Sequence, residues 1–102
     1  MNPYIVKYDY ENAEGIGVVI IYAKSIDDAM KKFRTRMFES GDSKWYEYVY
    51  HRSEFRHVAT NVYGWNTFYN ESANVCVKIR EINSKHGEVI PIYEHFDHDI
   101  DI

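Results

Sequence analysis

The fold is decided by residues 16–41, IGVVIIYAKSIDDAMKKFRTRMFESG. The first eight residues of this stretch are uncharged and apolar at odd and even positions alike, which predicts a β-strand buried on both faces and therefore central in a sheet. Ser25 predicts the start of a helix, because its hydroxyl can accept a hydrogen bond from an N–H group of the first turn. Two acidic residues follow it, as the positive end of a helix dipole favours, and Ser40-Gly41 predicts the end.

The predicted helix has one apolar stripe. At 100° per residue, five side chains fall within an arc of roughly 100°, the width of a core-facing stripe. They are Ile26, Ala29, Met30, Phe33 and Met37. We expect this stripe to pack on the sheet. Phe38 lies about 120° from Ile26, so it must contact something other than the sheet or be exposed.

The residues before this stretch predict the first strand of a hairpin. Alternation over residues 3–10 places one set of side chains on each face of a strand. One face carries Tyr4, Val6, Tyr8 and Tyr10, and the other carries Ile5, Lys7 and Asp9. A polar stretch at 11–15 separates this strand from the strand at 16–23, so the two are expected to pair.

A second hairpin is predicted at the C-terminal end. Residues 75–82 alternate as a strand, with Val75, Val77 and Ile79 pointing inward. A turn is expected at 83–87 and a returning strand at 89–93. Pro91 has no N–H to donate, which places that last strand at a sheet edge.

The middle of the chain is open to two interpretations. High β-propensity favours a strand at 45–50, followed by a short helix around 53–61 and a loop that contains Gly64. The alternative for the first segment is a helix, because Trp45, Tyr48, Val49 and Arg52 would share one side of it.

These elements predict an α+β fold in a single domain of residues 1–93. The domain is expected to hold an antiparallel sheet of about four to five strands and one main helix, with a ββα start and a C-terminal β-hairpin. Residues 94–102 are assigned to an acidic tail.

The net charge lies entirely in this tail. The chain of 102 residues has a formal charge of -4. Residues 1–93 contain 12 acidic and 12 basic side chains, and the tail adds Glu94, Asp97, Asp99 and Asp101. This balance argues against a basic protein that coats nucleic acid. The imidazoles of His95 and His98 beside these carboxylates suggest weak metal binding, but a flexible segment rarely preorganises a site.

Composition also bears on location. No apolar run approaches the ~20 residues that span a membrane, so no membrane partner is expected. The start MNPYIVKYDY lacks the basic and apolar regions of a signal peptide. The single cysteine, Cys76, cannot form an intramolecular disulfide. Together these features predict a cytoplasmic protein.

Aromatic side chains are concentrated in the middle of the chain. Residues 45–69 hold nine of the 17 aromatic residues, and the chain contains no leucine. We expect about half of these rings to replace leucine in the core and the rest to form a recognition surface. The predicted anchors of that surface are Trp45, Tyr48, Trp65 and Tyr69.

The same rings allow an alternative, which is stacking on single-stranded nucleic acid with help from Arg52 and Arg56. The cations of the predicted helix after Ser25 add little to this alternative, because Lys31 and Lys32 each follow an aspartate by four residues and are locally paired. No RNP-type motif, GXXG loop or zinc-knuckle pattern is present.

No motif for catalysis or a cofactor is apparent. His51 and His57 would be about 120° apart on a helix, which is wide for one metal ion. Cys76 lies inside a predicted strand, where a buried thiol is usual. We therefore expect a protein that is not an enzyme and that has no catalytic residues, metal site or cofactor.

Residues 23–30, AKSIDDAM, follow the predicted hairpin with a capped, acidic helix start. Over residues 4–33 the chain resembles small phage-encoded anti-defence proteins such as anti-CRISPRs, which share this ββα start. The resemblance implies a phage or mobile-element protein in the host cytoplasm that binds a larger host protein or nucleoprotein complex and inhibits or adapts it by steric occlusion. The aromatic anchors and the tail would make the contacts. The tail's Phe96, Asp97, Asp99 and Asp101 are expected to lie against basic residues of the partner.

Overall fold

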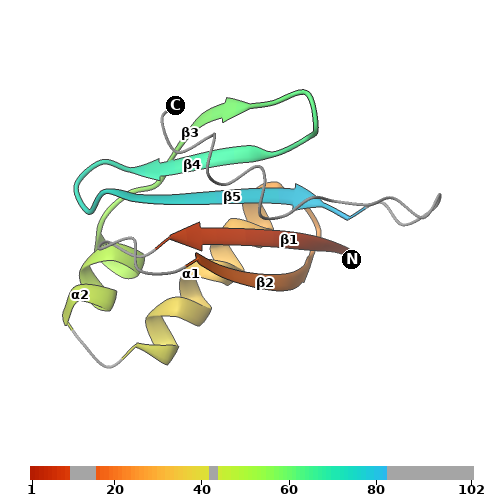
Figure 1. Ribbon diagram of the computed structural model, residues 1–102. Coiled ribbons are helices and arrows are strands. Elements are labelled where there is room, and N and C mark those ends of the chain that lie inside the picture. Colours follow the sequence, from red (N-terminus) through yellow and green to blue (C-terminus); the bar gives the residue numbers. More distant parts are fainter. Residues whose placement is uncertain (10–15, 42–43, 83–102) are drawn as a thin grey trace.

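The computed structural model describes residues 1–9, 16–41 and 44–82 (Figure 1). The chain begins with two strands, β1 (Asn2–Asp9) and β2 (Ile16–Ala23), followed by helix α1 (Ile26–Ser40). A short helix, α2 (Lys44–Tyr46), continues into a π-helical segment, η1 (Glu47–Arg52). Three strands follow, which are β3 (Arg56–Thr60), β4 (Asn66–Asn70) and β5 (Val75–Glu81).

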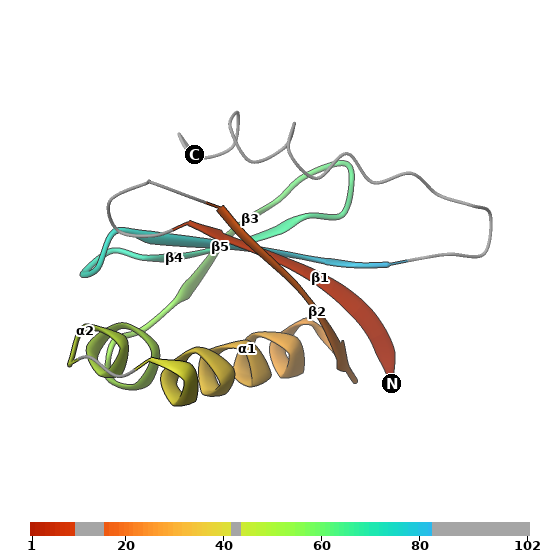
Figure 2. The same ribbon diagram turned by 60° about the horizontal axis from the view of Figure 1, so that its bottom comes forward.

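The five strands form one antiparallel sheet in the order β2-β1-β5-β4-β3. Figure 2 shows α1 and α2 together on one face of this sheet. The α+β class and the predicted number of antiparallel strands are therefore confirmed. No helix of the described residues is long and apolar enough to cross a membrane.

Three predictions about the elements need correction. The prediction of one main helix is not exact, because residues 44–52 form a second helical segment, whereas their β-propensity favours a strand at 45–50. Residues 53–61 contain strand β3 in place of a short helix, and strand β4 follows the predicted Gly64 loop. The predicted strand at 89–93 lies outside the described residues.

Packing explains why 45–50 is helical despite its β-propensity. Val49 and Tyr50 are buried, and Trp45 and Tyr46 are partly buried against the same core cluster. Helical spacing places these four side chains on one side of the segment, whereas a strand would alternate them between two faces. Burial of the four groups together outweighs the local propensity.

Strand β2 is an edge strand, so the prediction that it is central is wrong. In the described sheet it pairs with β1 alone, through eight consecutive residue pairs from Asn2–Ala23 to Asp9–Ile16. Its inner side chains Val19 and Ile21 pack against the core cluster. Its outer side chains remain exposed, with Val18 at 43%, Ile20 at 60% and Tyr22 at 63%.

Helix α1 begins and ends where its sequence predicts. The Ser25 hydroxyl accepts a hydrogen bond from the Asp28 N–H at 3.1 Å, and the Gly41 N–H donates to the Met37 carbonyl at 3.1 Å. A hydrogen bond of 2.9 Å from the Lys24 backbone N–H is the main cause that lowers the pKa of Asp28, and Lys32 adds to it. Since the carboxylate is favoured in the folded state, its contribution is present at neutral pH and is lost on acidification below the usual value of 3.8.

The predicted apolar stripe of α1 packs on the inner face of the sheet, against β2, β1 and β5. Ala29, Met30, Phe33 and Met37 are buried, and Ile26 is partly buried. Phe33 is fully buried, with its ring centroid 5.1 Å from that of Tyr8 on β1 and 5.8 Å from that of Tyr50 on η1. This residue therefore connects the sheet, the main helix and the second helical segment.

The side chain of Asn70 on β4 links η1 to the sheet. Its buried side chain donates to the Val49 carbonyl at 3.3 Å and to the Ser53 hydroxyl at 2.7 Å, and it accepts from the Ala73 N–H at 3.1 Å. Because the Asn70 amide both donates and accepts hydrogen bonds, these bonds offset the cost of removing it from water.

Replacing Phe33 with alanine should lower the free energy of unfolding by about 3–5 kcal/mol, because it leaves a cavity at the junction of three elements. Phe38→Ala is the matched control, since Phe38 is 37% exposed and should cost well under half as much. Chemical denaturation of both variants measures the difference. Equal losses would contradict the role given to Phe33.

Candidate functional site

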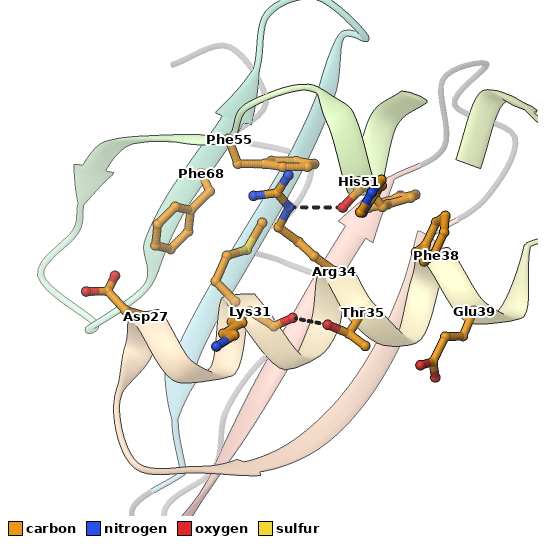
Figure 3. Close-up of a pocket in the computed structure, with 11 residues that line it drawn as sticks. Asp27, Lys31, Arg34, Thr35, Phe38, Glu39, His51, Phe55 and Phe68 are labelled. Carbon is orange, nitrogen blue, oxygen red and sulfur yellow. Dashed lines mark hydrogen bonds between the residues drawn. The ribbon is translucent and has the colours of Figure 1, made fainter. Parts of the chain in front are cut away.

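A groove of about 570 Å³ lies between α1, η1 and the neighbouring strands (Figure 3). Its lining contains both apolar and charged side chains. The lining residues are Asp27, Met30, Lys31, Arg34, Thr35, Phe38, Glu39, Tyr50, His51, Phe55 and Phe68. It is the first of two surfaces that could bind a partner.

Arg34 closes the floor of this groove. Its Nε donates to the Tyr50 carbonyl at 3.2 Å, and a terminal guanidinium nitrogen donates to the Ser53 carbonyl at 2.7 Å. The guanidinium carbon is 5.5 Å from the centre of the Phe55 ring, a cation–π distance. Figure 3 shows the Arg34 side chain reaching from α1 toward the opposite wall. The Arg34 charge thus joins α1 to the end of η1.

Phe38 and His51 form the rim at the other end of the groove. Their rings stack with centroids 4.7 Å apart and an interplanar angle of 22°. The sequence predicts that Phe38 contacts something other than the sheet or is exposed, and both are confirmed.

The groove's geometry limits the chemistry that it can support. Asp27 and Glu39 are twelve residues apart on α1, which corresponds to about 18 Å along the helix axis, so they cannot act as a carboxylate pair. Among residues 1–9, 16–41 and 44–82, no group of three His, Cys, Asp or Glu side chains could hold a metal ion. The groove is suited to contact with a ligand that carries both apolar and charged groups.

The predicted aromatic anchors do not form one surface. Tyr48 is exposed on η1, whereas Trp45 is partly buried and packs edge-on against Tyr46, with ring centroids 5.3 Å apart. Tyr69 is half-buried on β4, and its hydroxyl donates to the Asn74 side chain at 2.8 Å.

Trp65 is fully buried, so the prediction that it is an exposed anchor is wrong. It precedes β4, and the Lys7 ammonium lies over its ring at 4.7 Å from the ring centre. The sequence predicts a loop that contains Gly64, and directly after this glycine the chain turns back into β4 and carries the Trp65 ring onto the sheet. The tail residues Phe96, Asp97, Asp99 and Asp101 lie outside the described residues.

The two arginines of the nucleic-acid alternative are both exposed. Arg52 is in an ion pair with Glu47 at 3.0 Å, so its charge is partly neutralised. Arg56 lies on β3, at the opposite edge of the sheet from β2. The stacking alternative stays a prediction, and no contact among these residues favours it.

The second candidate surface is the outer edge of β2, which the sequence analysis did not identify. The uncharged, apolar composition of residues 16–23 could have indicated it, because a strand with apolar residues on both faces must either be central or leave one face exposed. The Lys32 ammonium donates to the Tyr22 carbonyl at 2.9 Å, so this contact occupies the last part of the edge. Residues 17–21 form the remaining length.

Comparison of the chain with models of known protein families, with curated proteins and with solved structures found no match. The function is therefore inferred from the two surfaces themselves.

Replacing Arg34 with methionine keeps much of the side-chain volume and removes both hydrogen bonds to the η1 end. We expect a loss of about 1.5–3 kcal/mol in the free energy of unfolding, the usual range for hydrogen bonds from a charged donor. Arg36→Met, on the exposed side of the same helix, is the control and should change little. If both variants unfold at the same denaturant concentration, the Arg34 guanidinium has no structural role and is free to bind a ligand.

Proposed function

We propose that this protein is a non-catalytic binding module that attaches to a larger protein through the outer edge of β2. One observation carries the proposal: an eight-residue, uncharged strand of regular register lies at the edge of the described sheet. Such an edge presents unpaired backbone groups and is a template for another strand.

The opposite edge of the sheet supports this assignment by contrast. Strand β3 has five residues, includes Arg56, and is interrupted by a register shift between His57 and Ala59. Short length, charge and a bulge are the devices by which natural sheets prevent unwanted pairing. Strand β2 has none of these three devices, so the two edges of the described sheet differ in their protection.

The side chains of β2 indicate what kind of segment would pair with it. Val18, Ile20 and Tyr22 alternate on the face of the sheet that carries no described helix, and each is between two-fifths and two-thirds exposed. In strand addition, main-chain hydrogen bonds provide affinity and alternate side chains provide specificity. The partner is therefore expected to offer an extended segment with apolar residues at alternate positions.

Such a contact fits the role that the resemblance implies. A small domain whose edge extends a partner's sheet would inhibit or adapt a host protein or nucleoprotein complex by occupying a surface, without chemistry at the contact. Tyr48 and the Phe38–His51 rim lie on the helical side, where a partner larger than the β2 edge would also make contact.

Replacing Ile20 with lysine tests the proposal, because a charge on this strand should oppose addition of another strand. Val62→Lys is the matched control, since Val62 is 92% exposed and lies in the turn between β3 and β4. Each tagged full-length protein is purified from the cells that naturally contain it, and co-purifying proteins are quantified by mass spectrometry. We expect a specific partner to fall about tenfold or more with Ile20→Lys, a change of about 1.4 kcal/mol in binding, and to be retained with Val62→Lys.

Two results would contradict the proposal. One is retention of every specific co-purifying protein by the Ile20→Lys variant while its fold is intact by circular dichroism. The other is an equal loss with Val62→Lys, which would indicate a general effect of added charge.

A further inference from the structure

The helix-free face of the sheet carries two lysines side by side. Lys7 on β1 is directly opposite Lys78 on β5, and these are two of the three innermost strands. The alternation that turns Tyr4, Val6 and Tyr8 toward α1 turns Lys7 to the other face, with Ile5 beside it. Lys78 is turned there in the same way between the core residues Val77 and Ile79.

Both lysine side chains are fully buried, as is Trp65, over which the Lys7 ammonium lies. Ile5 and Cys76 on the same face are also buried. All the described helices lie on the other face of the sheet (Figure 2). Burial of this face therefore requires a cover other than α1, α2 or η1.

The charge on this face indicates the chemistry of that cover. Cationic groups directly opposite each other destabilise a sheet, and burying them is costly unless negative charge lies close by. Alternation places three basic residues of β1 and β5 on this face, which are Lys7, Lys78 and Arg80, and one acidic residue, Asp9 at the end of β1. The cover should thus be acidic, with apolar groups for Ile5 and Trp65.

One segment of the chain has this composition. Residues 94–102 hold Asp97, Asp99 and Asp101, which alternate with His98, Ile100 and Ile102, and they contain no lysine or arginine. They follow Glu81, the last residue of β5, by twelve intervening residues. At up to about 3.3 Å per residue such a connection reaches about 40 Å, which is ample to return to the middle of the sheet.

We propose that the acidic segment 94–102 docks on the helix-free face of its own sheet, with its aspartates beside Lys7, Lys78 and Arg80. The segment then covers the helix-free face, and its carboxylates offset the local positive charge of Lys7, Lys78 and Arg80. This assignment replaces the expectation that the tail's carboxylates contact basic residues of a partner. It concerns β1 and β5 in the middle of this face, whereas the proposed function concerns β2 at its edge, and it does not depend on the proposed function.

Quenching of Trp65 fluorescence by acrylamide measures the cover directly, because acrylamide is neutral and does not respond to the charge of the face. The chain has two tryptophans, so Trp45→Phe leaves Trp65 as the reporter. In this background, Asp97→Asn/Asp99→Asn/Asp101→Asn should raise the quenching constant several-fold. Removing the same charge from exposed sites, with Glu39→Gln/Glu54→Gln/Glu71→Gln, should leave it unchanged. Equal quenching in all three proteins, each folded by near-ultraviolet circular dichroism, overturns the proposal.

A second measurement uses the unmodified full-length protein and does not depend on the folding of a variant. A carbodiimide joins a lysine to a carboxylate that contacts it, and the joined peptides are identified by mass spectrometry. We expect cross-links from Lys7 or Lys78 to Asp97, Asp99 or Asp101 within the monomer. Absence of these cross-links overturns the proposal, as does their occurrence only in a cross-linked dimer, where the tail would cover a second copy.

Discussion

The packing of Phe33 between Tyr8 and Tyr50 is the interaction on which the rest of the structure depends. These three rings belong to α1, β1 and η1, and their centroid separations of 5.1 and 5.8 Å are those of favourable aromatic pairs. A chain without leucine must fill its core with larger and fewer groups. Tyr50 continues the cluster to Trp45, Tyr46 and Phe55. The sequence predicts that about half of the rings of residues 45–69 lie on a recognition surface. In the structure, several of these rings instead join the helical segments to the sheet.

Local signals predicted the elements that local physics determines. Ser25 and Gly41 delimit α1 as predicted, and the alternation of Tyr4, Val6 and Tyr8 gives the face of β1 that meets the helix. The strand at 75–82 is also found, with Val75, Val77 and Ile79 buried. In each of these cases one side of the element is apolar and the other is not, or a cap marks the boundary, so the residues themselves contain the information.

The errors arose where a residue's surroundings come from distant parts of the chain. Residues 45–50 have the composition of a strand, and only the space beside Phe33 and Asn70 makes them helical. Trp65 lies on the sheet near Lys7, a residue 58 positions away, because the chain enters β4 there. The apolar pattern of β2 predicts two buried faces, but it contains nothing about which strands lie beside it. The candidate site at the β2 edge was therefore beyond the reach of the sequence, although its composition was visible.

A strand that is uncharged and apolar on both faces is expected in the centre of a sheet, but β2 lies at the edge of the described sheet. Exceptions of this kind are expected at functional surfaces. The most direct measurement is amide hydrogen exchange, followed residue by residue by NMR, for the free protein and for its complex with the co-purified partner. The account predicts that amides in residues 17–21 that point away from β1 exchange about tenfold or more slowly in the complex, while those of β3 are unchanged. Unchanged exchange along β2, with slowing confined to β3 or to the groove between α1 and η1, would contradict it.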